Sequence, residues 1–85
     1  MNIYRESVRS LLIAVCPDNL SINTRKEWCI KLESQLFTEY SLIDYRSNVK
    51  LLVNRIKKYQ TFLEGINEER LCRLNVTQLS KILCK

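Results

Sequence analysis

Residues 44–59, DYRSNVKLLVNRIKKY, decide how this chain folds. Their apolar side chains recur every three or four positions, at Tyr45, Val49, Leu52, Val53 and Ile56. This spacing places them on one face of an α-helix. Asp44 has a side chain suited to cap the first turn. Gly65, the single glycine of the chain, is expected to end this helical stretch in a left-handed conformation.

Two further helices are expected before this one. The first has apolar residues at helical spacing from Ile3 to Val15 and ends before Pro17, because the residue that precedes a proline avoids the α conformation. Residues 16–23, rich in Asp, Asn and Ser, then form a connector.

The second helix is predicted to start at Thr24. Glu27 follows Thr24 at the spacing of a capping box, just ahead of an apolar pattern. This helix should end near Tyr40. No segment has the strict alternation that is typical of a strand.

Downstream of Gly65 the sequence predicts short helices only. Asn67 is placed to cap residues 68–73, and either Asn75 or Thr77 begins a last helix. We therefore expect residues 1–85 to form one all-α domain, a three-helix bundle finished by one or two short C-terminal helices.

The composition argues against an enzyme. The 85 residues are 46% apolar and 27% charged, enough for one small core. There is no histidine, which excludes an imidazole base or a His metal ligand, and one glycine, which excludes a glycine-rich phosphate loop. We expect a binding module with no catalytic residue, no cofactor and no small-molecule substrate.

The sequence also lacks the pattern of a membrane protein. The apolar run at residues 11–16 is far shorter than the ~20 residues that a spanning helix needs, and it is too short for a secretory signal. We therefore expect no membrane partner and an intracellular location.

The cysteines are interpreted as structural. The four are Cys16, Cys29, Cys72 and Cys84. None forms a C-x-x-C pair, so a zinc site would need all four thiolates to converge from separate elements. Disulfides are uncommon inside cells. The preferred interpretation is that Cys29 and Cys72 are small core residues, and no metal site is expected.

The positive charge is concentrated in the third helix. The chain has 14 Lys and Arg and nine Asp and Glu, a net charge of +5. Residues 45–60 contain five bases and no acid, so they account for the whole excess. The candidate partner-binding residues are Arg46, Lys50, Arg55, Lys57 and Lys58. The basic face is either simply solvated or docks on an acidic protein surface or a phosphate backbone.

Direct binding of nucleic acid is the weaker of the two docking hypotheses. Proteins that bind single-stranded nucleic acid place exposed aromatic residues among their Lys and Arg side chains. In the third helix only Tyr59 could be an exposed aromatic residue of this kind. Readers of duplex DNA need Arg, Asn or Gln on a recognition helix, and Asn48 and Asn54 are the only candidate amides of this helix.

Four segments resemble the central domain of transcription elongation factor S-II (TFIIS). Residues 44–56, DYRSNVKLLVNRI, are similar to its conserved helix, and residues 28–39, WCIKLESQLFTE, to the helix before it, with Glu33 and Glu39 at acidic positions of the family. Val8-Arg9 matches the start of its first helix. Residues 62–66, FLEGI, followed by Leu71, Leu74 and Gln78-Leu79, are similar to its C-terminal segment. The four segments are collinear and span nearly the whole chain.

The resemblance implies a three-helix bundle that docks on the largest subunit of a multisubunit RNA polymerase through its basic third helix. Arg46, Lys50 and Lys57 stand where the family has bases. It also implies a nuclear location, or a cytoplasmic one for a viral transcription protein.

The chain departs from the family in several places. Asn48 and Leu52 replace family arginines, and the loop before Gly65 is shorter. The zinc ribbon with which the family promotes transcript cleavage is not among these residues. We therefore expect polymerase binding without stimulation of cleavage, and the alternative is a small basic helical protein that binds nucleic acid directly.

Overall fold

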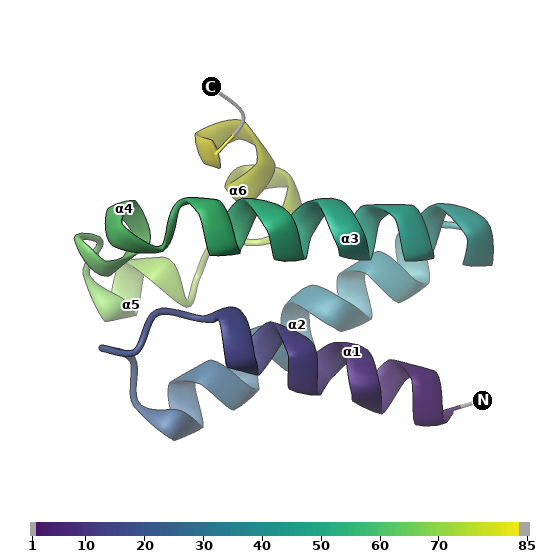
Figure 1. The fold of residues 1–85 in the computed structure, drawn as a ribbon, viewed down its shortest axis with the longest axis horizontal. Helices are drawn as coiled ribbons and strands as arrows, with labels where there is room; N and C mark the ends of the chain where they lie inside the picture. The colour runs from purple at the N-terminus through teal and green to yellow at the C-terminus, as the bar shows by residue number, and fades with distance from the viewer. Residues whose placement is uncertain (1, 84–85) are drawn as a thin grey trace.

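The structure, a computed structural model, describes residues 2–83 and contains six helices and no strand in that range. Three long helices, α1 (Asn2–Val15), α2 (Ile22–Glu39) and α3 (Leu42–Lys58), pack on one another. Three short ones follow: α4 (Gln60–Glu64), α5 (Glu68–Leu71) and α6 (Val76–Leu83). Figure 1 shows α3 above α1, with α2 behind and α4 and α5 together near the end of α3. The predicted all-α bundle is confirmed.

The long helices α2 and α3 begin earlier than their apolar patterns suggest. Ser21 caps α2, and its hydroxyl accepts a hydrogen bond from the Thr24 backbone N–H at 3.3 Å. Ser41 caps α3 in the same way, accepting from the Asp44 N–H at 3.3 Å. The predicted caps at Thr24 and Asp44 are therefore wrong by one turn. The first turn of each helix lies outside the core, so no buried residue marks it in the sequence.

The end of α3 also differs from the prediction. The helix stops at Lys58, and Tyr59, with φ −109° and ψ 28°, separates it from α4. Gly65 has φ −79° and ψ −9°, so the expected left-handed conformation is wrong. Its N–H instead bonds the Phe62 carbonyl at 3.2 Å in a right-handed turn.

The caps of the two last helices are confirmed. Asn67 Oδ1 accepts from the backbone N–H groups of Glu69 and Arg70 at the start of α5. Asn75 and Gln78 bond reciprocally at 2.8 and 2.9 Å, each side chain accepting from the other's backbone N–H. Asn75 rather than Thr77 therefore begins α6.

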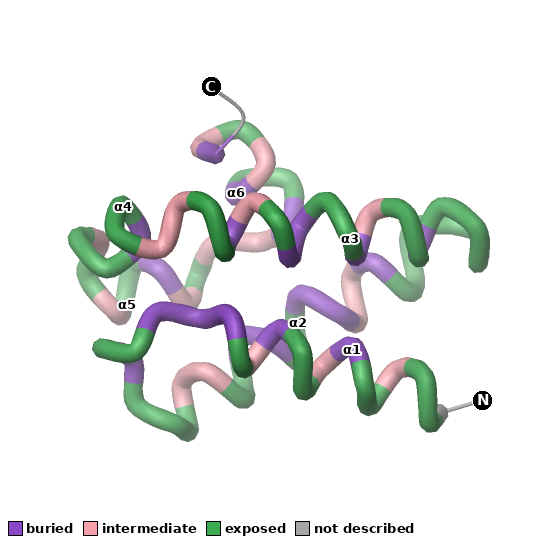
Figure 2. Tube along the Cα trace, in the orientation of Figure 1, coloured by how far each residue is buried: buried purple, intermediate pink, exposed green. Residues whose placement is uncertain are grey.

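The core lies between the three long helices and extends under the short ones. Figure 2 shows buried segments where α1 and α3 face each other. The five residues of the pattern in residues 44–59 are all buried, as predicted. Trp28 on α2 is buried, and its indole N–H donates to the Leu74 carbonyl at 2.9 Å, which ties α2 to the segment between α5 and α6.

The connector between α1 and α2 is part of the core, although its composition is polar. Cys16 and Leu20 are buried, and Cys16 Sγ lies 3.2 Å from Cys29 Sγ on α2. Cys29 is a core residue as predicted, while Cys72 is half-buried against the core. Cys84 lies outside the described residues.

Residues 2–83 contain no group of three or more cysteine or acidic side chains arranged to hold a metal ion. Within the same residues, no helix combines the length and apolar character needed to cross a bilayer.

Candidate partner-binding surface on α3

The five predicted partner-binding bases do not share one side of α3. Successive residues of an α-helix are rotated by about 100°, so positions four and eleven residues apart fall near one line along the helix. Arg46, Lys50 and Lys57 have this spacing and are all exposed. We call these three residues the basic stripe. Arg55 falls on the opposite flank of α3, and Lys58 between the two.

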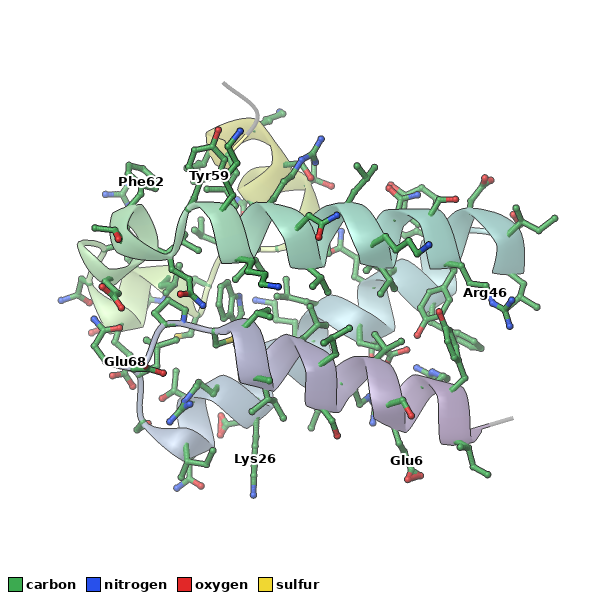
Figure 3. All side chains as sticks on the ribbon, viewed as in Figure 1. Glu6, Lys26, Arg46, Tyr59, Phe62 and Glu68 are labelled. Atoms are coloured by element: carbon green, nitrogen blue, oxygen red, sulfur yellow. The ribbon has the colours of Figure 1, made fainter. Side chains whose placement is uncertain are left out.

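The basic stripe runs along the side of α3 that adjoins α1. The guanidinium carbon of Arg46 lies 5.0 Å from the ring centroid of Tyr4 on α1, within range of a cation–π contact. Lys50 lines a groove that it shares with residues of α1. Figure 3 shows Arg46 extending toward the N-terminal end of α1, whereas Glu6, the one acid of α1, points away from α3.

The basic stripe carries uncompensated charge. None of its three side chains forms an ion pair with a carboxylate of residues 2–83. The one acid of α3 is Asp44, in the first turn, where its carboxylate accepts from the Ser41 hydroxyl at 3.1 Å. Clustered charge of one sign on a surface attracts ligands of the opposite sign. The geometry therefore suits an acidic ligand that lies along α3.

Arg55 and Lys58 are engaged elsewhere. Arg55 is half-buried, and its Nη1 donates to the Ser80 hydroxyl of α6 at 3.2 Å, which links α3 to α6. Lys58 is exposed, with its ammonium 5.4 Å from the Tyr59 ring centroid. The structure thus separates two of the five predicted residues from the basic stripe.

Of the two amides considered for reading a duplex, Asn48 is engaged by its own helix. Its Nδ2 donates to the Asp44 backbone carbonyl at 2.8 Å, and the side chain is half-buried. Asn54 is exposed. One accessible amide is a poor basis for reading base edges, which normally takes several side chains.

A buried carboxylate fixes α3 against the other long helices. Glu33 on α2 has no exposed surface. Its oxygens accept from Arg5 Nε and Nη2 at 2.8 and 3.1 Å, from Arg9 Nε at 2.8 Å and from the Tyr45 hydroxyl at 2.8 Å. We call these four residues the Glu33 cluster. Because Tyr45 directly precedes Arg46, the cluster sets the position at which the basic stripe begins.

The protonation states of the Glu33 cluster follow from these bonds. Burial opposes ionisation of Glu33, but the hydrogen bonds from Arg5, Tyr45 and Arg9 outweigh it and hold its pKa below the usual value. Burial, and then the bond to the carboxylate, raises the pKa of Tyr45. At neutral pH the cluster therefore contains an ionised Glu33 and a neutral, donating Tyr45.

The sequence interpretation identified Glu33 as a point of family resemblance and missed its structural role. A signal was present: Glu33 follows Cys29 by four residues and Leu32 by one, so it falls on the apolar face of α2. A carboxylate on a core-facing position is rarely buried without partners. The two arginines of α1 were the available partners.

Comparison with protein-family models, with curated proteins and with solved structures gives no match for this chain. The similarity to the S-II central domain therefore stays a prediction that rests on the residues quoted for it.

Proposed function

We propose that this protein is a docking module that binds a multisubunit RNA polymerase through the basic stripe of α3, in the manner of an S-II central domain. The observation that carries the proposal is the line of three exposed bases with no carboxylate partner among residues 2–83. The collinear resemblance supplies the class of partner. Catalysis and stimulation of transcript cleavage are not part of the proposed role.

The Glu33 cluster includes residues from several of the segments that carry the resemblance. Arg9, Glu33 and Tyr45 come from three of the four similar segments, and Arg9 and Tyr45 both bond Glu33. Residues separated by 24 and 12 positions in the chain thus meet at one point in the bundle. Three residues on which the resemblance depends therefore also hold α1, α2 and α3 together in this chain.

The expected contribution of the basic stripe is electrostatic. A single exposed ion pair contributes only about 0.2–1 kcal/mol, so one substitution would have a small effect. Charge reversal at all three positions replaces attraction with repulsion along the whole surface. Salt should weaken binding, because exposed charges are screened over about 8 Å at physiological ionic strength.

Pull-down of a purified multisubunit RNA polymerase tests the proposal. The variant is Arg46→Glu, Lys50→Glu and Lys57→Glu together. The matched control reverses three exposed bases away from the basic stripe, Lys26→Glu, Arg70→Glu and Lys81→Glu, and so has the same net charge. Figure 3 shows Lys26 on the side of the bundle away from α3. We expect polymerase recovery to fall at least tenfold with the stripe variant only.

Two results would contradict the proposal. Equal recovery with the wild type and the stripe variant would remove the basic stripe as the docking surface. Retention of polymerase-free duplex or single-stranded DNA at low salt, with affinity that falls steeply as salt rises, would favour direct binding of nucleic acid.

A further inference from the structure

An apolar groove runs between α1 and α3, directly beside the basic stripe. Its volume is about 350 Å³. The side chains that line it include Tyr4, Ser7, Val8, Leu11, Lys50 and Val53. Leu11 is 47% exposed and Tyr4 is 39% exposed, so the groove presents large apolar side chains to solvent.

The two edges of the groove differ in charge. The α3 edge carries Lys50, with Arg46 and Lys57 on the same line of the helix. The α1 edge contributes Ser7 and apolar side chains, and Glu6 points away from α3 (Figure 3). A ligand complementary to this surface has an apolar face with carboxylates along one side only.

The length of the basic stripe indicates the shape of that ligand. Arg46 and Lys57 are eleven residues apart, which corresponds to about 16 Å along a helix, or three turns. The bases follow one another at intervals of four and seven residues. Acidic residues at the same helical intervals on a second helix, laid beside α3, would meet all three bases. Amphipathic helices bind apolar grooves through anchors with this periodicity.

We propose that the groove between α1 and α3 binds an acidic amphipathic helix of a partner protein. The apolar face of that helix packs on the exposed parts of Leu11 and Tyr4, which lie above the buried Val8 and Val53, and its carboxylates lie along the basic stripe. This inference rests on the proposed function for the source of the partner, a polymerase subunit. It specifies in addition the secondary structure and the polarity of the segment that is bound.

The other occupants fit the groove less well. A nucleic acid would use the basic stripe but would find one aromatic side chain in the groove, Tyr4, whose ring already contacts Arg46 and the Tyr45 ring, and Leu11 is aliphatic and cannot stack on a nucleobase. A second copy of this chain lacks a suitable helix, because the acids of its long helices are interspersed with bases: Glu6 lies between Arg5 and Arg9, and Lys26 precedes Glu27. An acidic helix from another protein remains the occupant that satisfies both the apolar and the charged part of the surface.

Titration of the ¹⁵N-labelled protein with a designed peptide provides the test. The probe is an 18-residue helical peptide with leucines at i, i+4, i+7 and i+11 and glutamates along one flank. Its control has the same composition in an order that scatters the leucines around the helix. We expect the probe, and not the control peptide, to shift the backbone amide signals of residues 4–11 and 46–57.

Matched substitutions separate the groove from the rest of the surface. Leu11→Gln removes an apolar anchor without changing the charge, and Ile30→Gln makes the same kind of change at a 43% exposed position of α2 outside the groove. We expect Leu11→Gln to weaken binding of the probe about tenfold, the effect of losing burial of one large aliphatic side chain. Ile30→Gln should leave binding unchanged.

The outcomes distinguish this inference from the proposed function. Equal binding of both peptides, or no effect of Leu11→Gln, would overturn the groove as a helix site. If the stripe variant fails to recover polymerase in the pull-down and Leu11→Gln recovers it normally, polymerase docking through the basic stripe would be supported and helix binding in the groove would be rejected. If binding of the probe depends on Leu11 but the wild type recovers no polymerase, the groove would be supported as a helix-binding site and the polymerase would be rejected as its partner.

Discussion

Replacement of Glu33 by glutamine tests whether one buried carboxylate holds the three long helices together. The carboxylate accepts four hydrogen bonds, and a glutamine of the same size keeps one acceptor oxygen and turns an NH₂ group toward arginine donors. Breaking a buried ion pair by changing one partner costs about 3–5 kcal/mol. Arg5 and Arg9 are 23% and 32% exposed, so water relieves part of that cost. We expect the free energy of unfolding to fall by about 2–3 kcal/mol.

Urea and thermal unfolding measure this loss. A domain of this size has a total stability of roughly 4–13 kcal/mol, so the change is a large share of it and corresponds to a fall in Tm of about 10–20 °C. The buried Trp28 provides a fluorescence signal for the transition. The control is Glu39→Gln, an exposed acid of the same helix that accepts one bond from Gln35 at 3.1 Å. A loss for Glu33→Gln no larger than that of the control would refute the role of the cluster.

The difference in free energy of unfolding between the wild type and Glu33→Gln, measured as a function of pH, tests the ionisation of Glu33. Its pKa in the folded protein lies below the unfolded value, about 4.3, because the bonds from Arg5, Tyr45 and Arg9 outweigh the effect of burial. The contribution of Glu33 to stability is therefore complete above the unfolded pKa and is lost as the pH falls through the folded pKa. The difference between wild type and Glu33→Gln should be constant from pH 6 to 8 and shrink below about pH 4. A difference unchanged from pH 7 to pH 3 would contradict an ionised carboxylate.

Three further predictions concern local structure. Gly65→Ala should leave the protein equally stable or up to about 1 kcal/mol more stable in thermal unfolding, because φ is negative and an added Cβ meets the Phe62 carbonyl oxygen at an ordinary 3.4 Å; a loss above that size would imply a strained site. Ser41→Ala should lower the free energy of urea unfolding by about 1 kcal/mol through loss of the α3 cap. Diamide should oxidise the adjacent thiols of Cys16 and Cys29 to one intramolecular disulfide and should itself be reduced to the hydrazine. Mass spectrometry after alkylation in denaturant should then find that two of the four cysteines carry no alkyl group. Alkylation of all four cysteines would count against the contact.

The long helices were predictable because their burial is periodic. The apolar pattern of residues 44–59 identified all five buried residues of α3, since a 3.6-residue repeat places them on one face whatever the neighbours are. The starts of α2 and α3 were missed because their first turns are exposed and are fixed only by the hydroxyls of Ser21 and Ser41. A polar connector contains several side chains that could form such a capping bond, and the pattern of buried residues does not indicate which of them does.

The composition of the candidate site was predictable from the sequence, but its contacts with the other helices were not. The charge count located the bases on one helix, and the rotation of about 100° per residue already places Arg55 on the flank opposite the basic stripe. The sequence did not show that Arg55 bonds Ser80 of α6, a residue 25 positions away. The Glu33 cluster depends in the same way on contacts 12 to 28 residues apart. Such contacts are set by how the helices pack. A sequence pattern on one helix does not contain that information.

The Glu33 cluster and the groove are linked through aromatic contacts, which gives a last prediction. Glu33 bonds the Tyr45 hydroxyl, and the Tyr45 ring meets the ring of Tyr4 edge-on at 6.0 Å between centroids. Tyr4 lines the groove, whereas Glu33 does not. Glu33→Gln should therefore weaken binding of the acidic amphipathic peptide several-fold at 10 °C, where the variant is still folded, while Glu39→Gln leaves binding unchanged. Unaltered affinity in a folded Glu33→Gln variant would show that the groove keeps its shape without the buried carboxylate, and that the cluster acts on stability alone.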